Sequence, residues 1–203
     1  DILSKAAIFW RSETHWIGGM GVLVFLLTIV PMVGGHSMQL MRAESPGPVV
    51  DKLRPKIRHT AVILYVMYFA FTVVECIFLL IGGMPLFDAI CMSFGTAGTG
   101  GFAVSNAGIS GYNSAYIEMV IAVFMVIFAV NFGICYMILT KRFKDALKNE
   151  ELKIFFMIIV FQVVLISVNV YHIYGSVGTT FRNVFFTVAS IISSTGFGTA
   201  DFN

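Results

Sequence analysis

The sequence predicts an all-α, multi-pass membrane protein that is built from repeated units. Hydrophobic residues make up 58% of the 203 residues and charged residues only 12%, about half the charged share of an ordinary soluble domain. Four apolar stretches are long enough to cross a bilayer. Two Gly-rich segments of similar pattern, residues 96–100 and 194–198, each follow a shorter apolar stretch. Each unit is therefore expected to contain a long helix, a short helix, a Gly-rich strand and a second long helix.

The long stretches each approach the roughly 20 residues that a helix needs to cross a hydrocarbon core of about 30 Å. In chain order they cover residues 16–33, 60–81, 116–139 and 154–171. Charges are rare in them: Glu75 lies inside the second and Glu118 near the start of the third. These stretches predict four membrane-spanning helices.

Residues 85–94 and 179–192 are apolar but too short to span, which is typical of re-entrant or interfacial segments. Pro85 suits a first helical position, and Asp88 would complement the positive end of the helix dipole. Thr179 or Thr180 can serve as the N-cap of the second. We therefore expect two short helices that end in the Gly-rich segments.

Basic residues orient the chain, because Lys and Arg collect in cytoplasmic loops. They gather between the first and second spans (Arg42, Lys52, Arg54, Lys56, Arg58) and between the third and fourth (Lys141, Arg142, Lys144, Lys148, Lys153). With both loops cytoplasmic, both short helices enter the membrane from the outer face.

A repeat with an offset of 98 residues pairs Gly98 with Gly196 and Gly100 with Gly198. It divides the chain into three parts. Residues 1–56 hold the closing span of a first repeat and a cytoplasmic loop, 57–140 a complete second repeat, and 141–203 a loop with the first part of a third. We expect this chain to be an internal piece, with one further Gly-rich strand just before Asp1 and another beyond Asn203.

The two Gly-rich segments resemble pore loops, in which backbone carbonyls replace the water around a cation. Turning successive carbonyls toward one axis needs unusual backbone angles, which glycine reaches without steric cost. The lack of an acidic ring favours a monovalent ion over a divalent one. The alternative to a pore-loop role is that both segments are ordinary loops outside the membrane. The candidate filter residues are Thr96, Ala97, Gly98, Thr99, Gly100, Ser194, Thr195, Gly196, Phe197 and Gly198.

Three segments carry a family resemblance along the whole chain: Phe9 to Gly21 (FWRSETHWIGGMG), Thr96 to Phe102 (TAGTGGF) and Ser190 to Phe197 (SIISSTGF). They resemble the TrkH/KtrB/HKT superfamily of potassium transporters, nearest its bacterial TrkH branch. The resemblance implies four repeats around a pseudo-fourfold pore and uptake of K⁺ driven by the membrane potential. It also implies a homodimer in the bacterial inner membrane, surrounded by lipid, with a cytoplasmic nucleotide-binding regulatory subunit. No organic cofactor, enzymatic activity or nucleic-acid partner is implied.

Three alternatives to potassium transport remain. A sodium-permeable transporter, or one coupled to sodium or protons, would share the fold, and filter residues outside this chain would decide between them. A membrane-embedded hydrolase would need a nucleophile–base or metal cluster in the spans, which the sequence does not display. A purely structural helix bundle would not need two Gly-rich filters.

Single residues inside the spans also leave alternatives. Glu75 is either a functional intramembrane carboxylate or a protonated or hydrogen-bonded packing residue near the outer water. Asn131 with Gly133 favours interhelical hydrogen bonding and close packing over a bend near an inner gate. His15 and His172 are expected at the membrane edges. The isolated cysteines Cys76, Cys91 and Cys135 are expected as small apolar packing residues.

Overall fold

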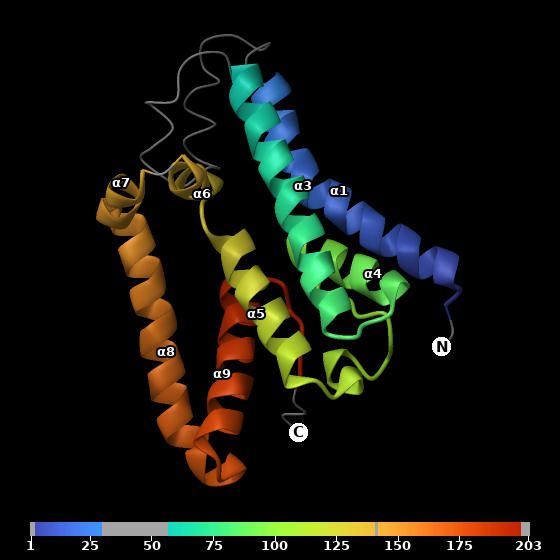
Figure 1. Cartoon of the computed structure of the whole chain (residues 1–203), viewed down its shortest axis with the longest axis vertical. Coiled ribbons are helices and arrows are strands. Elements are labelled where there is room, and N and C mark those ends of the chain that lie inside the picture. Colours follow the sequence, from blue (N-terminus) through green and yellow to red (C-terminus); the bar gives the residue numbers. More distant parts are fainter. Residues whose placement is uncertain (1–2, 30–56, 141, 200–203) are drawn as a thin grey trace.

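The computed structural model describes residues 3–29, 57–140 and 142–199, and every regular element in these ranges is a helix (Figure 1). The elements are α1 (Lys5–Ile29), α3 (Ile57–Ile81), α4 (Leu86–Ala97), η3 (Ile109–Tyr112), α5 (Ala115–Ala129), α6 (Phe132–Leu139), α7 (Phe143–Lys148), α8 (Glu150–Tyr174) and α9 (Val177–Ile192). The all-α fold predicted from the sequence is confirmed.

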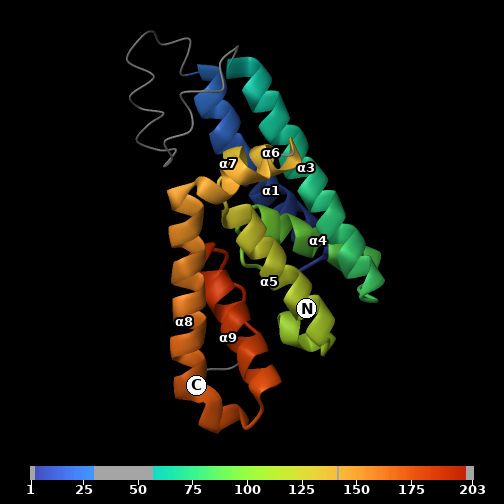
Figure 2. The same cartoon turned by 60° about the vertical axis from the view of Figure 1, so that its left-hand side comes forward.

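The long helices α3 and α8 begin at the same end of the molecule, and each is followed by a short helix that turns back from the opposite end (Figure 1). The short helix α4 packs on α1 and α3, and the short helix α9 packs on α8 and α5. The rotated view shows α8 and α9 side by side and α4 close to α1 and α3 (Figure 2). Both short helices therefore enter from the same face, as the charge distribution predicted.

The starts of the short helices differ slightly from the prediction. Pro85 is the N-cap residue of α4 and not its first helical residue. Helix α9 begins at Val177 with Ser176 at the N-cap, so neither threonine caps it. Thr180 instead turns its hydroxyl back, donating to the carbonyl oxygen of Ser176 at 2.8 Å. The cap lies earlier because the reversal after α8 is completed by Gly175, whose φ is +64°.

The third predicted span is not one continuous helix. Helices α5 and α6 meet at a bend of 103°, and Val130 between them is extended. Asn131 caps α6, its side-chain oxygen accepting a hydrogen bond from the Gly133 N–H at 2.8 Å. The bend, which was the less favoured alternative from the sequence, is therefore present. The Asn131 side-chain oxygen accepts a hydrogen bond from the backbone of its own helix and not from a neighbouring helix.

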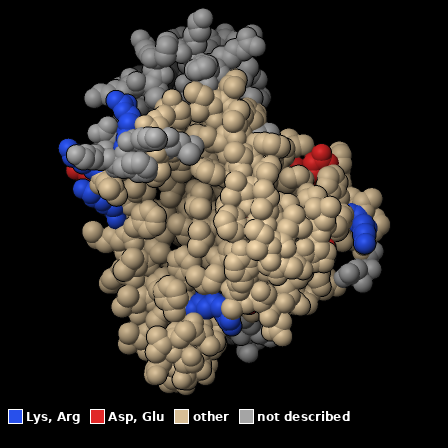
Figure 3. Space-filling view, in the orientation of Figure 1, with Lys and Arg blue, Asp and Glu red and all other residues tan. Residues whose placement is uncertain are grey.

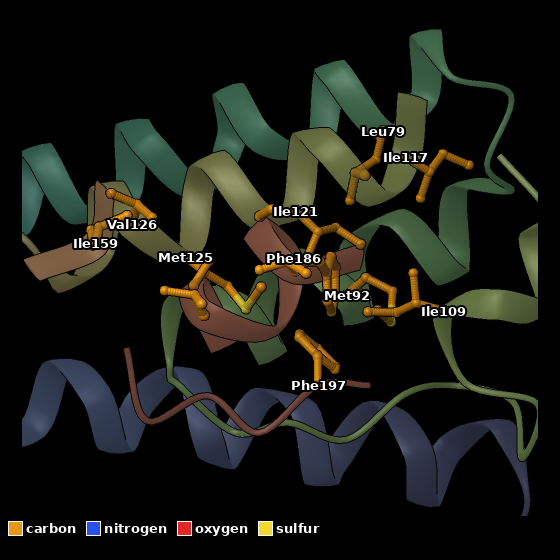
Figure 4. Close-up of a cluster of buried hydrophobic side chains, with 14 of the residues drawn as sticks. Leu79, Met92, Ile109, Ile117, Ile121, Met125, Val126, Ile159, Phe186 and Phe197 are labelled. Carbon is orange, nitrogen blue, oxygen red and sulfur yellow. The ribbon is translucent and has the colours of Figure 1, made fainter. Parts of the chain in front are cut away.

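The main core lies where α5 and α9 meet α3 and α4. Buried side chains such as Leu79, Met92, Ile121 and Phe186 form it, and Phe197 reaches into it from the segment after α9 (Figure 4). Between helices in a membrane, such side chains stabilise the fold mainly through close van der Waals packing. This core fixes the chain that leaves α9 against the helices of the preceding repeat.

Many large apolar side chains are exposed, among them Val168, Ile173 and Phe161 on α8. On the face shown in Figure 3, most charged side chains lie near the edges, one basic group lies low on the face, and a broad area carries no charged side chain. By length and composition, Val62–Ile81 and Glu150–Tyr174 could each cross a membrane, and the bent pair α5 and α6 together forms a third candidate. The chain is a polytopic membrane protein. The end of the first predicted span (residues 30–33) and most of the first basic loop lie outside the described residues.

Candidate functional site

The chain leaves α4 and α9 through two turns that have the same backbone conformation. Thr99 and Ser194 both adopt left-handed angles, with φ of 49° and 59°. Two residues later, Gly101 and Gly196 also have positive φ, at 68° and 84°. Each of these pairs is separated by 95 residues. A non-Gly residue rarely adopts positive φ, so this shared pattern marks the two turns as structural equivalents.

The hydrogen bonds of the two turns repeat with the same separation. The Gly100 N–H donates to the Gly95 carbonyl at 2.7 Å, and the Thr195 N–H donates to the Ser190 carbonyl at 3.0 Å. The offset of 98 predicted from the sequence is therefore wrong for the backbone, and the correct offset is 95. The error arose because the Gly-x-Gly spacing occurs in both segments at positions that are not equivalent.

This register changes what the predicted glycines do. Of Gly98, Gly100, Gly196 and Gly198, only Gly196 has positive φ. Gly98 has φ of −81° and ends α4 as its C-cap. A Cβ on Gly98 would lie 2.5 Å from the His15 carbonyl oxygen, so Gly98 allows close packing against α1.

The two turns lie against each other. A Cβ on Gly101 would overlap the carbonyl oxygen of Thr195 and approach the carbonyl carbon of Gly196 to 3.2 Å. Segments that are far apart in the sequence thus meet backbone to backbone. Glycine at position 101 is required both by this contact and by its positive φ.

The phenylalanine that follows each of these glycines has a different environment. Phe102 is about half exposed, with the Arg11 guanidinium 4.9 Å from its ring centroid and the His15 ring at 5.1 Å. Phe197 is buried, and its ring tip would lie 3.2 Å from a Cβ on Gly95. The segments after α4 (residues 99–103) and after α9 (residues 194–198) are called the second-repeat and third-repeat strands below, although neither pairs in a β-sheet. They are therefore equivalent in backbone but not in packing.

Side chains also hold the strands from behind. Arg11 donates from Nη2 to the Ala103 carbonyl at 2.9 Å. Ser190 donates to the Phe197 carbonyl at 2.7 Å, and the hydroxyls of Ser193 and Thr195 lie 2.7 Å apart. The carbonyl oxygens of Ala103 and Phe197 are therefore directed toward these side chains.

At the turn after α4, the two remaining predicted residues, Thr96 and Ala97, lie in the helix and not in the strand. Thr96 is fully buried and donates to the Met92 carbonyl one turn earlier, at 3.0 Å. Ala97 is the last residue of α4. Four residues of these turns were not among the filter residues predicted from the sequence: Gly101, Phe102, Ser190 and Ser193. The Gly-Phe dipeptide shared by both segments, at 101–102 and 196–197, was the signal that could have aligned them.

Polar side chains lie among the apolar residues where α1, α3 and α4 pack together. Glu75 is fully buried, and neither carboxylate oxygen has a well-formed hydrogen bond, although Thr96 is its neighbour. Nearby, the Trp16 indole N–H donates to the Thr72 hydroxyl at 3.1 Å. Both predicted alternatives for Glu75, a functional carboxylate and a protonated or hydrogen-bonded packing residue, stay open.

The outer start of α4 is tied to η3. The Tyr112 hydroxyl donates to an Asp88 carboxylate oxygen at 2.6 Å. Burial, and then this hydrogen bond to Asp88, raise the pKa of Tyr112 above its ordinary value. Within the described ranges, no group of three or more His, Cys, Asp or Glu residues could hold a metal ion. The backbone carbonyls of the two turns are the candidate cation ligands.

Comparison with known families matches residues 1–203 to the TrkH family, described as a cation transport protein. The chain belongs to this family. A similar relative is the Trk system potassium uptake protein TrkH of Salmonella typhimurium, 37% identical over 203 residues, covering 98% of this chain and 42% of the relative. The Trk system potassium uptake protein TrkG of Escherichia coli is 31% identical over 204 residues, covering 98% of this chain and 42% of that protein.

The fold is also similar to the crystal structure of the potassium transporter TrkH from Vibrio parahaemolyticus. The TM-score is 0.78 at 27% sequence identity, with 98% of this chain and 40% of that chain covered. The chain thus spans about two fifths of the length of these relatives. The family resemblance read from the sequence is confirmed.

Proposed function

We propose that this chain forms part of a potassium uptake protein in which the turns after α4 and α9 are two parts of one selectivity filter. The observation that carries this proposal is the pair of equivalent turns, with positive φ at Thr99, Gly101, Ser194 and Gly196, in direct contact at Gly101. Backbone strain persists only where the surrounding structure maintains it, and it concentrates at functional sites. Two unrelated surface loops would not be expected to share the same strained backbone and to contact each other. The choice of K⁺ as the transported ion is supported by the relatives that are named as potassium uptake proteins.

In the proposed mechanism, carbonyl oxygens of residues 99–102 and 194–196 replace part of the water shell of K⁺. Left-handed residues change the direction of successive carbonyls, so that several can face the same ion. Both short helices end at these turns, and the partial negative charge of a helix C-terminus favours a cation. Selection then depends on neutral dipoles and not on acidic side chains.

The site includes the residues named from the sequence, with their roles redistributed. Thr99, Gly100, Ser194, Thr195 and Gly196 contribute strand carbonyls, together with Gly101 and Phe102. Phe197 anchors the third-repeat strand through its buried ring and its bond to Ser190. Thr96, Ala97 and Gly98 place the strand against α1 and α3, and Gly198 continues the third-repeat strand. Transport is driven by the membrane potential, which supplies about 2.3 kcal/mol per unit charge for each 100 mV.

Two repeats do not enclose a pore. We propose that the intact protein arranges four such repeats with pseudo-fourfold symmetry, as a homodimer in the bacterial inner membrane. A cytoplasmic nucleotide-binding regulatory subunit is the proposed partner. The apolar side chains on α8, among them Val168 and Phe161, are largely exposed and provide surface for lipid or for the remaining repeats.

Gly196→Ala in the intact protein provides the test, with Gly175→Ala as its matched control. Both glycines have positive φ, 84° and 64°, and a Cβ would meet nothing within 4 Å at either position. Both substitutions therefore introduce a similar backbone strain of about 1 to 2 kcal/mol, but only Gly196 lies in the proposed filter. The measurement is the flux of rubidium and of sodium into proteoliposomes.

The expected result is rubidium-selective flux in the wild type that collapses, or becomes sodium-permeable, in Gly196→Ala alone. Equal flux ratios in the wild type and both variants would place the filter elsewhere. A wild-type preference for sodium would replace potassium with the sodium alternative on the same fold.

A further inference from the structure

The two filter strands differ at one equivalent position on the short helices, Gly95 on α4 and Ser190 on α9. With an offset of 95, these positions lie seven residues before Phe102 and Phe197. A Cβ on Gly95 would lie 3.5 Å from the Phe102 carbonyl oxygen. At the other position, the Ser190 hydroxyl donates to the Phe197 carbonyl at 2.7 Å. The same place in each repeat therefore faces the same carbonyl, but only one repeat supplies a donor there.

We propose that Ser190 is a positioning residue that fixes the direction of the Phe197 carbonyl and so stiffens the third-repeat strand, while the second-repeat strand has no such bond. This inference rests on the proposed function for its effect on ion selection. Its structural part, a strand held by one side-chain hydroxyl, stands on the geometry alone.

The backbone around Phe197 explains why this one bond matters. Gly196 and Gly198 flank Phe197, and a Cβ on either glycine would meet nothing within 4 Å. Glycines restrict rotation of the neighbouring peptides least of all residues. The Phe197 peptide is therefore held by its buried ring and by the Ser190 hydroxyl, and not by its chain neighbours.

The second repeat is held in a different way and from a different side. Gly95 leaves room for the Phe197 ring, whose tip would lie 3.2 Å from a Cβ at that position. Its strand is fastened one residue later and from outside the repeat, where Arg11 of α1 donates to the Ala103 carbonyl at 2.9 Å. The presence of Ser190 in one repeat and Gly95 in the other is thus a built asymmetry between the two strands.

The test compares Ser190→Ala with Ser93→Ala in the intact protein. Ser93 is an equally suitable serine on the other short helix, fully buried, with a hydroxyl that donates over the same 2.7 Å but to Ala89 of its own helix. The two readouts are hydrogen–deuterium exchange of the amides of residues 195–199 and the rubidium-to-sodium flux ratio. Ser190→Cys, which keeps the side-chain size but donates weakly, serves as a second variant if Ser190→Ala does not fold.

Ser190→Ala is expected to speed exchange in residues 195–199 and to lower the flux ratio about fivefold, the effect of losing one hydrogen bond of average strength. Ser93→Ala should leave both readouts unchanged, and Ser190→Cys should fall between. Unchanged exchange and an unchanged ratio in Ser190→Ala would overturn the inference. Faster exchange with an unchanged ratio would overturn its selectivity part. A wild type that transports neither ion would instead overturn the proposed function, and the exchange data would still decide whether Ser190 holds the strand.

Discussion

At the scale of single residues, glycines in this chain serve two distinct purposes. Gly98 and Gly19 allow backbones to approach, since a Cβ on Gly19 would lie 3.0 Å from the Gly98 Cα. Gly196 is needed for its φ of 84° alone, because the space around it is empty. Gly101 combines both demands. Composition shows that there are 19 glycines, but only the backbone distinguishes these roles.

Gly101→Ala is expected to be the most damaging glycine substitution in the described part of the chain. The new methyl would overlap the Thr195 carbonyl and would also sit on a residue with φ of 68°, and overpacking and strain together cost about 3 kcal/mol or more. Thermal unfolding of the detergent-purified intact protein measures the effect. Gly178→Ala, in α9 with nothing within 4 Å of its Cβ, is the control. A melting temperature that Gly101→Ala leaves unchanged would contradict the contact between the two turns.

At the scale of elements, α4 is fixed at both ends. Its C-terminal end packs on α1 through Gly98, and its N-terminal turn carries Asp88, which accepts the Tyr112 hydroxyl at 2.6 Å. The η3 segment thus acts as a brace between the second-repeat strand and the start of the short helix. A short helix cannot rely on its own propensity for stability, so these external contacts determine its position.

Tyr112→Phe is expected to weaken this brace by about 1 kcal/mol, the net contribution of one hydrogen bond, and to change the response to alkaline pH. Because the pKa of Tyr112 is raised in the folded state, the unfolded chain loses its phenolic proton first, and the bond stabilises the fold fully below about pH 10. That contribution is lost as pH rises further. Melting temperatures measured from pH 8 to pH 11 should therefore fall more steeply for the wild type than for Tyr112→Phe. Parallel curves would show that the phenol does not contribute.

At the scale of the whole molecule, α5 and α9 are joined by more than apolar packing. Arg182 on α9 lies 2.9 Å from a Glu118 carboxylate oxygen on α5, and the side chains are 32% and 10% exposed. The pair links the closing helix of one repeat to the short helix of the next. Its partial burial makes it stronger than a surface ion pair, whose contribution is often close to zero.

A double-mutant cycle with Arg182→Gln and Glu118→Gln should give a coupling free energy of about 1 kcal/mol, because the two groups lie 2.9 Å apart and are partly buried. Equilibrium unfolding of the intact protein in detergent provides the four stabilities. Arg182→Gln alone should cost more than Glu118→Gln, since it leaves the more buried charge without its partner. Additive effects within error would rule out a direct interaction.

Much of the fold followed from the sequence, because apolar length and charge placement act over many residues at once. Long helices at 60–81 and 154–171, each followed by a short helix, were expected, and they are present as α3, α4, α8 and α9 with somewhat different bounds. The break after Ala129 was not preferred, since it depends on whether one Asn131 side chain bonds to its own backbone or to a neighbour. The repeat offset was missed for a related reason: it is set by φ angles at Thr99 and Ser194, residues whose type does not favour positive φ. The hydrogen bond from Ser190 to the Phe197 carbonyl could not be predicted from the sequence either, because it forms only when the strand folds back over α9.

The packing of the short helices has a consequence for synthesis. Helix α4 rests on α1 and α3, and α9 rests on α5 and α8, so both supports of each short helix precede it in the chain. A ribosome that delivers this protein to the membrane from its N-terminus has therefore already released both supporting helices when each short helix emerges. Each short helix can therefore pack on these two helices as soon as it emerges, whereas the contact of the α4 turn with Thr195, made at Gly101, forms only after α9 has followed.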